Sequence, residues 1–529
     1  MRKIVLLILA FLAGGAILAQ EMPSDFHRIT LESTFQQFQA TNNAAGMGLF
    51  QPHSGSQTQI ETFYSAGDDH LSQEGSPDYG FDFSTLRYDR FSDKLFMRGS
   101  FHYSLDREKE RKWSDVIDPW FSIPFIYGNA IAKDYDKHQC GLTLDLYTAP
   151  LADWISVGIR TKYDVADISG LRDPRPRTGY LNYQFVPSAL ATFGSHHVGL
   201  DLGYGYSKEK LSGLTTIQSY PNLYYYKMSG LDHVDGAIGA YSGFKRQFYG
   251  PRYLADLSYC YTSGHVRALV SGGLEYGRLD AYGDKKGSPG SWNYFLYNAL
   301  ADIQFQNGSL LHQIHWTGSF KDAGADEFLQ ELNSEKDPVT GITTETWVTL
   351  YEYKNRYMLK QYETALDYTL YGGYTGSDYK WTMQAGAAFD AFEKDCYLPN
   401  SVFASDRISL SLGGTFLLYE SDRPIQIKVG DYPRHRLEAS VNALGSLPLM
   451  TFQRLLYEND YAREVLIPDA VHYGKKRFGG NASLTWTFPL NLGKAGWANG
   501  YVRLSGGYCK AMPEGNRTNA TLSVGLFTF

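Results

Sequence analysis

The sequence is poor in cysteine and, after its first residues, in long apolar runs. Only 4 of 529 residues are cysteine, and Cys140, Cys260, Cys396 and Cys509 lie more than 100 residues apart. No CxxC pair or zinc-ligand spacing is present. We expect unpaired cysteines, with a disulfide in an oxidising envelope as the alternative. After residue 19, no apolar run reaches the roughly 20 residues that a membrane-spanning helix needs.

An excess of one charge sign is also lacking. The chain carries 49 Lys and Arg against 56 Asp and Glu, a formal net charge of −7. It has no basic cluster, which argues against nucleic acid as a partner. Glycine, at 53 residues, follows no period of three, so a collagen-like chain is excluded.

Aromatic residues are abundant. The chain contains 41 Tyr and 30 Phe, and 43% of its residues are apolar. Disordered chains are poor in aromatic residues and cannot bury enough apolar surface to fold. The composition therefore predicts an ordered protein.

The first 19 residues have the pattern of a secretory signal peptide. Arg2 and Lys3 precede an uncharged run over Ile4–Leu18, and Ala19 supplies a small residue at the expected cleavage point. We expect residues 20–56 to form an N-terminal periplasmic or lumenal segment and residues 57–529 to form the main domain.

From about residue 57 onward, apolar and polar residues alternate along the chain. Residues 95–106, 154–164 and 197–207 show the pattern clearly. A helix cannot separate apolar from polar residues at this spacing, whereas a strand does so automatically. The sequence predicts an all-β protein.

Several features favour a closed antiparallel transmembrane β-barrel over a secreted β-propeller or β-sandwich array. Short and long connections alternate, tyrosine lies near predicted strand ends, the chain stops inside a strand, and no propeller-blade repeat is present. The polar faces also carry charges that a water-filled lumen accepts and a sandwich core does not. The residues predicted to line the lumen are Arg98, His102, Arg160, Lys162, Asp201, Arg267, Glu275, Asp302, Glu363 and Asp367.

The connections set the expected number of strands. Short turns are predicted at Ala149–Asp153, Gly194–His196, Thr262–Gly264, Asn307–Gly308 and Tyr419–Arg423. Long loops are predicted near residues 107–136, 209–237, 321–345 and 442–472. This pattern gives about 18 strands, or as few as about 14, because residues 238–249 and 346–356 are ambiguous.

Two segments carry resemblances to known barrels. The last strand, Thr521–Phe529 (TLSVGLFTF), resembles the terminal signal that outer-membrane barrels present to their assembly machinery. Its terminal phenylalanines share a face with Gly525 and Ser523, which predicts either a bulge or aromatic side chains turned inward. Asn42–Phe50 (NNAAGMGLF) is similar to the lumenal N-terminal segment of fatty-acid-transporter-type barrels, without that segment's proline.

Taken together, the leader, the tyrosine-rich strands and the length resemble an uncharacterised family of Bacteroidota outer-membrane β-barrel proteins. The resemblance implies a location in the outer membrane, in contact with its lipid. It implies no particular activity.

Aromatic residues in three long loops are candidates for binding a ligand or a partner. Trp120 and Phe121 lie in residues 107–136, which form either a constriction in the lumen or a solvated outer loop. Tyr224, Tyr225 and Tyr226 either bind a ligand or partner or pack within their own loop. Residues 442–472 carry an aromatic and leucine set spaced roughly like one helix face, suited to a cap on the barrel mouth or to docking a neighbour: Phe452, Leu455, Leu456, Tyr457 and Tyr461.

Catalysis, a metal site and a cofactor are not expected. His102, His197 and His315 fall on predicted lumen faces, but no GxSxG motif accompanies them. Asp232–Asp235 contains three potential ligands, a cluster that is common in loops by chance.

Two functions remain. One is a channel or transporter for a small or amphipathic solute. The alternative is a non-conducting accessory subunit of a larger outer-membrane complex, such as a nutrient-uptake assembly with a receptor or lipoprotein.

Overall fold

The computed structural model describes residues 35–50, 54–121, 123–215, 225–238, 246–283, 287–336, 338–376, 378–398, 400–421, 435–491 and 497–528. The predicted signal peptide and the first part of the predicted N-terminal segment lie outside the described residues. Among the described residues, no helix is long and apolar enough to cross a membrane.

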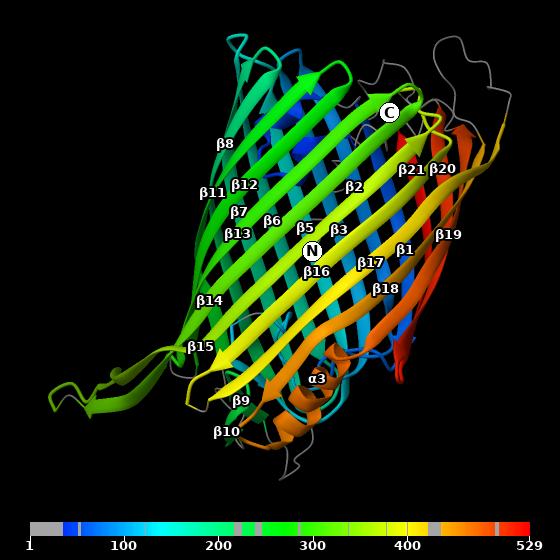
Figure 1. The fold of residues 1–529 in the computed structure, drawn as a ribbon. Helices are drawn as coiled ribbons and strands as arrows, with labels where there is room; N and C mark the ends of the chain where they lie inside the picture. Colours follow the sequence, from blue (N-terminus) through cyan, green and yellow to red (C-terminus); the bar gives the residue numbers. More distant parts are fainter. Residues whose placement is uncertain are drawn as a thin grey trace.

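Eighteen strands form one closed antiparallel sheet, which confirms the predicted barrel and its strand number. Neighbouring strands in the ring pair in sequence order, and β1 pairs with β21 to close it (Figure 1). The barrel strands are β1 (Gly55–Gly67), β2 (Asp78–Ser92), β3 (Leu95–Arg111), β5 (Lys133–Thr148), β6 (Ile155–Gly170), β7 (Arg175–Phe193), β8 (His196–Thr215), β11 (Arg246–Ser263), β12 (Val266–Tyr282), β13 (Gly290–Asn307), β14 (Leu310–Lys336), β15 (Thr343–Gly372), β16 (Trp381–Cys396), β17 (Ser401–Glu420), β18 (Arg436–Arg454), β19 (Lys476–Asn491), β20 (Trp497–Met512) and β21 (Asn516–Thr528).

The remaining elements lie within the long loops and the N-terminal segment. A three-stranded sheet contains β4 (Ile126–Gly128), β9 (Tyr225–Ser229) and β10 (His233–Ile238). A π-helical turn at Ala462–Leu466 leads into α3 (Ile467–Tyr473), and two 3₁₀ turns occupy Gln37–Ala40 and Ala45–Leu49. Figure 1 shows α3, β9 and β10 together at one end of the barrel. We call it the long-loop end and the opposite one the short-turn end.

The outer surface of the barrel is an apolar band between aromatic belts. On β11, Leu257 is 60% exposed and lies between the exposed residues Tyr253 and Tyr259. At the short-turn end, the exposed rings of Trp154 and Phe193 stack with centroids 6.5 Å apart. Such a band flanked by aromatic rings matches a membrane's hydrocarbon layer and its two interfaces.

One predicted long loop is a hairpin instead. Residues 321–345 were expected to form a loop, but β14 continues to Lys336 and β15 begins at Thr343. β13 pairs with β14 only as far as Glu327, and β16 pairs with β15 only from Tyr357. Residues 328–356, the projecting hairpin, therefore extend beyond the barrel wall (Figure 1). The prediction failed because a hairpin outside the membrane has no hydrocarbon to impose alternation.

Other predicted loop boundaries are also wrong. β3 runs to Arg111 and β8 to Thr215, so the loops predicted at 107–136 and 209–237 begin later. β18 runs to Arg454, well into the loop predicted at 442–472. A bulge opposite Arg407, near Pro448, interrupts the alternation there. The predicted turn at Tyr419–Arg423 lies partly outside the described residues.

The C-terminal strand was predicted to contain either a bulge or aromatic side chains turned inward. β21 pairs with β1 and β20 with no register shift, so no bulge is present within its described residues. Phe527 faces the lumen, 1% exposed, with its ring centroid 5.5 Å from that of Tyr501. The expected inward turn of the aromatic side chain therefore holds for Phe527. Phe529 lies outside the described residues. The four cysteines form no disulfide.

Candidate functional site

Residues 35–50, the plug segment, lie inside the lumen near the short-turn end. Gln37 Nε2 donates to Asp302 Oδ1 at 2.7 Å, and the Ala45 amide donates to Ser188 Oγ at 3.0 Å. Asn42 Nδ2 donates to Asp256 Oδ2 at 2.9 Å. Because these partners belong to β13, β7 and β11, the segment is attached to several sides of the barrel. This is the lumenal position that the fatty-acid-transporter resemblance implies.

Two wall glycines provide the space for the plug segment. A Cβ atom on Gly158 would lie 2.5 Å from the Ala45 amide nitrogen, and one on Gly199 would lie 2.6 Å from Asn43 Nδ2. Real Cβ atoms do not approach other atoms this closely, so the backbone of the segment packs directly on the wall at Gly158 and the Asn43 side chain does so at Gly199. Phe38 and Met47 are fully buried at this contact.

A buried charge network also holds the plug segment against the barrel wall. Asp145 is fully buried and bonds Arg98 Nη1 at 3.0 Å and Arg160 Nε at 2.6 Å. Arg160 also donates to the Thr41 carbonyl oxygen. The guanidinium groups of Arg98 and Arg160 share the Asp145 carboxylate. The N–H groups of Arg160 that do not bond Asp145 hold the plug segment.

The other predicted lumen residues have varied surroundings. Asp302 accepts bonds from Gln37, Gln313 and His315, so it links the plug segment to β14. Arg267 lies over the Phe50 ring, 4.3 Å from its centroid. The remaining positions are His102 packed over Gly141, Asp201 fully buried directly opposite Asp256, Glu275 bonded to the Tyr294 hydroxyl at 2.7 Å, Asp367 beside Gly386, and Lys162 and Glu363 on a cavity wall.

Beyond the plug segment the lumen contains two cavities. The inner cavity, about 490 Å³, extends from Gln39–Asn42 to the walls that carry Lys162, Glu363 and Asp390. The outer cavity, about 250 Å³, lies between Phe121 and Tyr473 and shares Glu363 and Asp390 with the inner one. The two cavities therefore adjoin at these acids.

The loop after β3 narrows the lumen at the long-loop end, which is the constriction alternative for this segment. Lys394 Nζ donates to the Trp120 carbonyl oxygen at 2.7 Å, and Lys321 Nζ donates to the Phe121 carbonyl oxygen at 2.9 Å. The Phe121 ring packs edge-on against Phe392. Trp120 and Phe121 thus lie against the inner wall.

A second buried ion pair fixes the other side of this loop. Arg246, 1% exposed, bonds Asp115 Oδ2 at 3.0 Å and Glu209 Oε1 at 3.1 Å. Asp115 Oδ1 accepts the Tyr127 amide at 3.1 Å. Burial raises the pKa of the Asp115 carboxyl, and the attraction of Arg246 opposes that rise. The loop is attached to β8 and β11 on one side and to β14 and β16 on the other, so it crosses the lumen.

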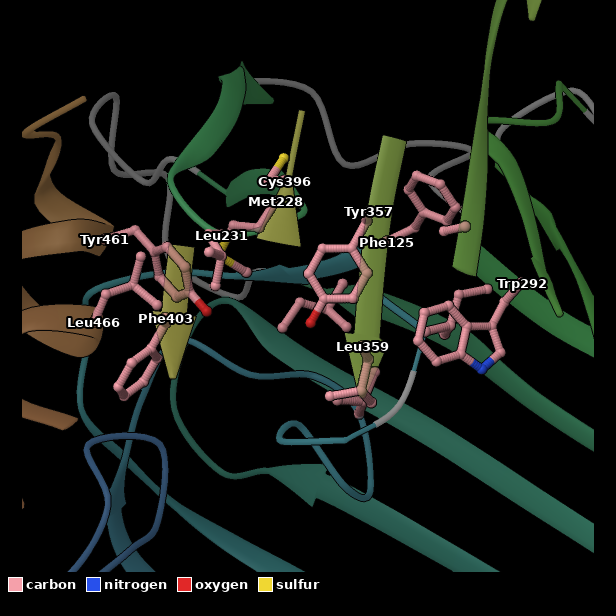
Figure 2. Packing of buried hydrophobic residues seen from close by; sticks show 14 of the residues in the cluster. Phe125, Met228, Leu231, Trp292, Tyr357, Leu359, Cys396, Phe403, Tyr461 and Leu466 are labelled. Carbon is pink, nitrogen blue, oxygen red and sulfur yellow. The ribbon is translucent and has the colours of Figure 1, made fainter. Parts of the chain in front are cut away.

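An apolar cluster joins the loops to the wall. Figure 2 shows Tyr461 and Leu466 beside Phe403, with Met228 and Leu231 between them and Tyr357. We call residues 112–132, 225–234 and 455–475 the cap. Tyr225 is buried beside Tyr127, and Tyr226 packs on Trp113, so both tyrosines pack against the loop after β3 rather than within their own loop. Tyr224 lies outside the described residues.

The helical part of the cap begins later than its residue spacing indicated. Phe452 lies in β18 rather than on a helix, and Leu456 and Tyr457 are exposed. Helical structure begins only at Asp460. The Asp232 carboxylate accepts the amides of Leu456 and Tyr457 at 2.7 and 2.8 Å, so it anchors this loop. No group of three or more potential metal ligands occurs among the described residues.

His472 makes the cap sensitive to acid. Its Nδ1 lies 3.2 Å from Asp69 Oδ1, but Arg477 already bonds both oxygens of that carboxylate. Burial, together with the positive charges of Arg477 and Arg407, lowers the pKa of His472 from 6.5 to about 3, and Asp69 only partly opposes them. The folded cap therefore holds a neutral imidazole that the unfolded chain protonates near pH 6.5.

We expect acid to loosen the cap. The contribution of His472 to the free energy of unfolding of the cap does not change above pH 6.5. Below pH 6.5 the cap loses about 1.4 kcal/mol of stability per pH unit as the pH drops toward 3. Hydrogen exchange of residues 462–473 at pH 7 and pH 5 measures this change. His472→Gln, which does not titrate, should reduce the difference between the two pH values. An equal acid response in both proteins would contradict the prediction.

Sequence reasoning missed the residues that seat the plug segment. Gln37 and Asp302 are 265 residues apart in the chain, and nothing in the sequence pairs them. The alternating pattern of residues 154–164 does place Gly158 on the polar face. A glycine on a lumen face signals a close backbone approach, but it does not identify what approaches.

These features define a class of protein. The closed ring of strands, the apolar exterior between aromatic belts and the polar, plugged lumen are those of a transmembrane β-barrel of the outer-membrane type. The chain belongs to a family of unknown function (DUF6850), whose model matches residues 44–528. No curated protein sequence matches the chain significantly.

Several solved barrels are similar in outline. A FadL homologue from Pseudomonas aeruginosa is 11% identical, with a TM-score of 0.31 and coverage of 92% of this chain and 93% of its own. The ferric citrate transporter FecA is 9% identical, with a TM-score of 0.40 and coverage of 89% of this chain and 78% of its own. The copper transporter OprC is also 9% identical, with a TM-score of 0.36 and coverage of 89% of this chain and 80% of its own. At these TM-scores the likenesses carry no argument about solute or mechanism.

Proposed function

We propose that the protein lies in the outer membrane and conducts a small polar or amphipathic solute through its lumen, rather than acting as an enzyme. The observation that carries this proposal is the pair of adjoining cavities, about 490 and 250 Å³, that lie between the plug segment and the cap. A structural barrel would have no need to keep charged side chains around an empty space. The plug segment then acts as the inner gate, and the cap narrows the outer end of the lumen.

Solute flux tests this proposal. The mature protein and a variant without residues 36–50 are reconstituted into liposomes, and swelling in a small uncharged sugar is recorded. Removal of the segment opens the short-turn end, so the variant should admit the sugar much faster than the intact protein does. Heat-modifiable migration on a gel confirms that both barrels are folded. Swelling no faster than that of empty liposomes, with a folded variant, would refute the channel.

The projecting hairpin favours a second candidate, an accessory subunit of a larger assembly. Leu329, Leu350 and Tyr351 are each more than half exposed on it. Both strand edges continue beyond their barrel neighbours, which leaves backbone groups suited to pairing with another chain. A receptor or lipoprotein is the expected partner.

The two candidates make different predictions for one variant. If the accessory role is the function, Leu350→Lys should release a partner that co-purifies with the wild-type barrel, and neither protein should conduct. If the channel is the function, the variant should conduct like wild type. We further propose that the assembly machinery contacts β21, whose outward residues include Leu522 and Val524, 44% and 50% exposed.

A further inference from the structure

The inner cavity has charges of opposite sign on opposite walls. Lys162 lines it from β6, whereas Glu363 and Asp390 line it from β15 and β16. β15 is the seventh strand from β6 around the ring of 18, so these walls lie almost opposite each other. Arg160 on β6 and Asp256 on β11 also line this cavity, and Arg160 is paired with Asp145. Lys162 therefore faces a net negative charge on the wall across the cavity.

The positive wall carries a lysine that makes no ion pair within the described part of the chain, although the carboxylate of Asp256, which lines the same cavity, attracts it. The residues directly opposite Lys162 on the neighbouring strands are Thr143 and Gln184, both neutral. Among the described residues, its ammonium group makes no hydrogen bond or ion pair. By contrast, Arg160, two positions away, is fully engaged by Asp145 and Thr41.

The negative wall carries two acids side by side. Glu363 and Asp390 are direct cross-strand partners, and like charges in that position destabilise a sheet. Arg407 is the next partner across from Asp390, yet its Nη2 donates instead to the Tyr473 carbonyl oxygen at 2.7 Å. The cap thus binds one end of this guanidinium group, which attracts the Asp390 carboxylate but forms no ion pair with it among the described residues.

We infer that the solute of this barrel is a small zwitterion with an apolar side chain, such as an amino acid or a short peptide. Its ammonium group binds between Glu363 and Asp390, and its carboxylate faces Lys162. The rings of Phe121, Phe392 and Tyr473 in the adjoining cavity receive the apolar part. This inference rests on the proposed channel function and names its substrate class.

The charge arrangement explains why a zwitterion is favoured over singly charged relatives. A simple cation is attracted by the two acids but repelled by Lys162. A simple anion is attracted by Lys162 but repelled by the two acids. Only a molecule with both charges satisfies both walls, and like-charge contacts discriminate against the others. A volume of about 490 Å³ is within the range of small-molecule sites.

Four forms of one dipeptide test the inference. Alanyl-phenylalanine is the zwitterion, its N-acetyl form the anion, its C-terminal amide the cation, and the doubly blocked form the neutral reference. Their uptake into liposomes is measured with the barrel that lacks residues 36–50, together with their binding to it by calorimetry. The zwitterion should bind about tenfold or more tightly than each of the other forms.

Wall variants assign the two ends of the solute. In Lys162→Met, the zwitterion and the amide should bind equally, because the carboxylate has lost its partner. In Glu363→Gln combined with Asp390→Asn, the zwitterion and the N-acetyl form should bind equally. Lys380→Met, at an exposed lysine outside the cavity, is the control and should keep the wild-type order.

The outcomes separate the inference from the function on which it rests. Equal or absent binding of all four forms, in a barrel that passes an uncharged sugar, overturns the zwitterion alone. If the wall variants keep the wild-type order of binding among the four forms, the zwitterion inference is likewise overturned while the channel function stands. Failure of the plug-free barrel to pass any solute overturns the channel itself.

Discussion

Gly158→Val is expected to open the short-turn end of the barrel. The new side chain would occupy the space of the Ala45 amide and the Ala44 carbonyl carbon, 2.5 and 2.8 Å from the Cβ position, and these backbone atoms cannot move aside. Overpacking costs about 1–3 kcal/mol. About 1.4 kcal/mol changes an equilibrium tenfold, so the released fraction should rise by about fivefold to about a hundredfold. Single-channel recording in planar bilayers measures the change as a higher open probability.

Gly179→Val is the matched control for this variant. A Cβ atom on Gly179 meets no other atom within 4 Å, although this glycine also lies in a barrel strand. Its conductance should equal that of wild type. If Gly158→Val stays as closed as wild type while its barrel is folded, the plug segment is not the inner gate.

Asp115→Ala is expected to unfold the loop that crosses the lumen. The substitution leaves the Arg246 guanidinium, 1% exposed, with Glu209 as its remaining carboxylate partner and removes the acceptor of the Tyr127 amide. Removing one member of a buried ion pair costs about 3–5 kcal/mol. Limited proteolysis should therefore cut residues 112–132 much faster than in wild type, whereas the barrel strands stay protected.

An exposed ion pair on the same cap provides the comparison. Arg463 and Asp460 lie 2.8 Å apart with side chains 60% and 64% exposed. Exposed pairs contribute little stability, so Asp460→Ala should leave the rate of cleavage unchanged. Equal cleavage of Asp115→Ala and wild type would show that the buried pair does not hold the cap.

The barrel could be predicted from the sequence because hydrocarbon and lumen water impose opposite demands on alternate residues. On β8, Leu200 and Leu202 are half exposed on the outer surface, and Asp201 between them is fully buried. The strand number follows from the same pattern, since each crossing of the membrane repeats it. Only the bulges, such as the one opposite Arg407, broke the rule.

The parts outside this rule could not be predicted. The projecting hairpin meets no membrane, so neither face of residues 328–336 needs to be apolar. The plug segment and the cap depend on contacts between distant residues, such as Gln37 with Asp302 and Asp115 with Arg246. The charged wall residues could be named from alternation, but their partners could not. Those partners distinguish a network that seats the plug segment from charges that face a cavity.

The gate at the short-turn end can be tested by locking it. The Cγ of Asn43, where the sulfur of a cysteine would lie, is 3.3 Å from the Cβ position of Gly199. The Ser258 hydroxyl lies closer still to the same Cβ position, so Ser258→Ala makes room for it. A barrel with Asn43→Cys, Gly199→Cys and Ser258→Ala, and with the four native cysteines changed to alanine, can therefore form a disulfide there. Oxidation should abolish solute flux into liposomes and reduction should restore it. Flux that is the same in both states would contradict a plug segment that moves to let solute through.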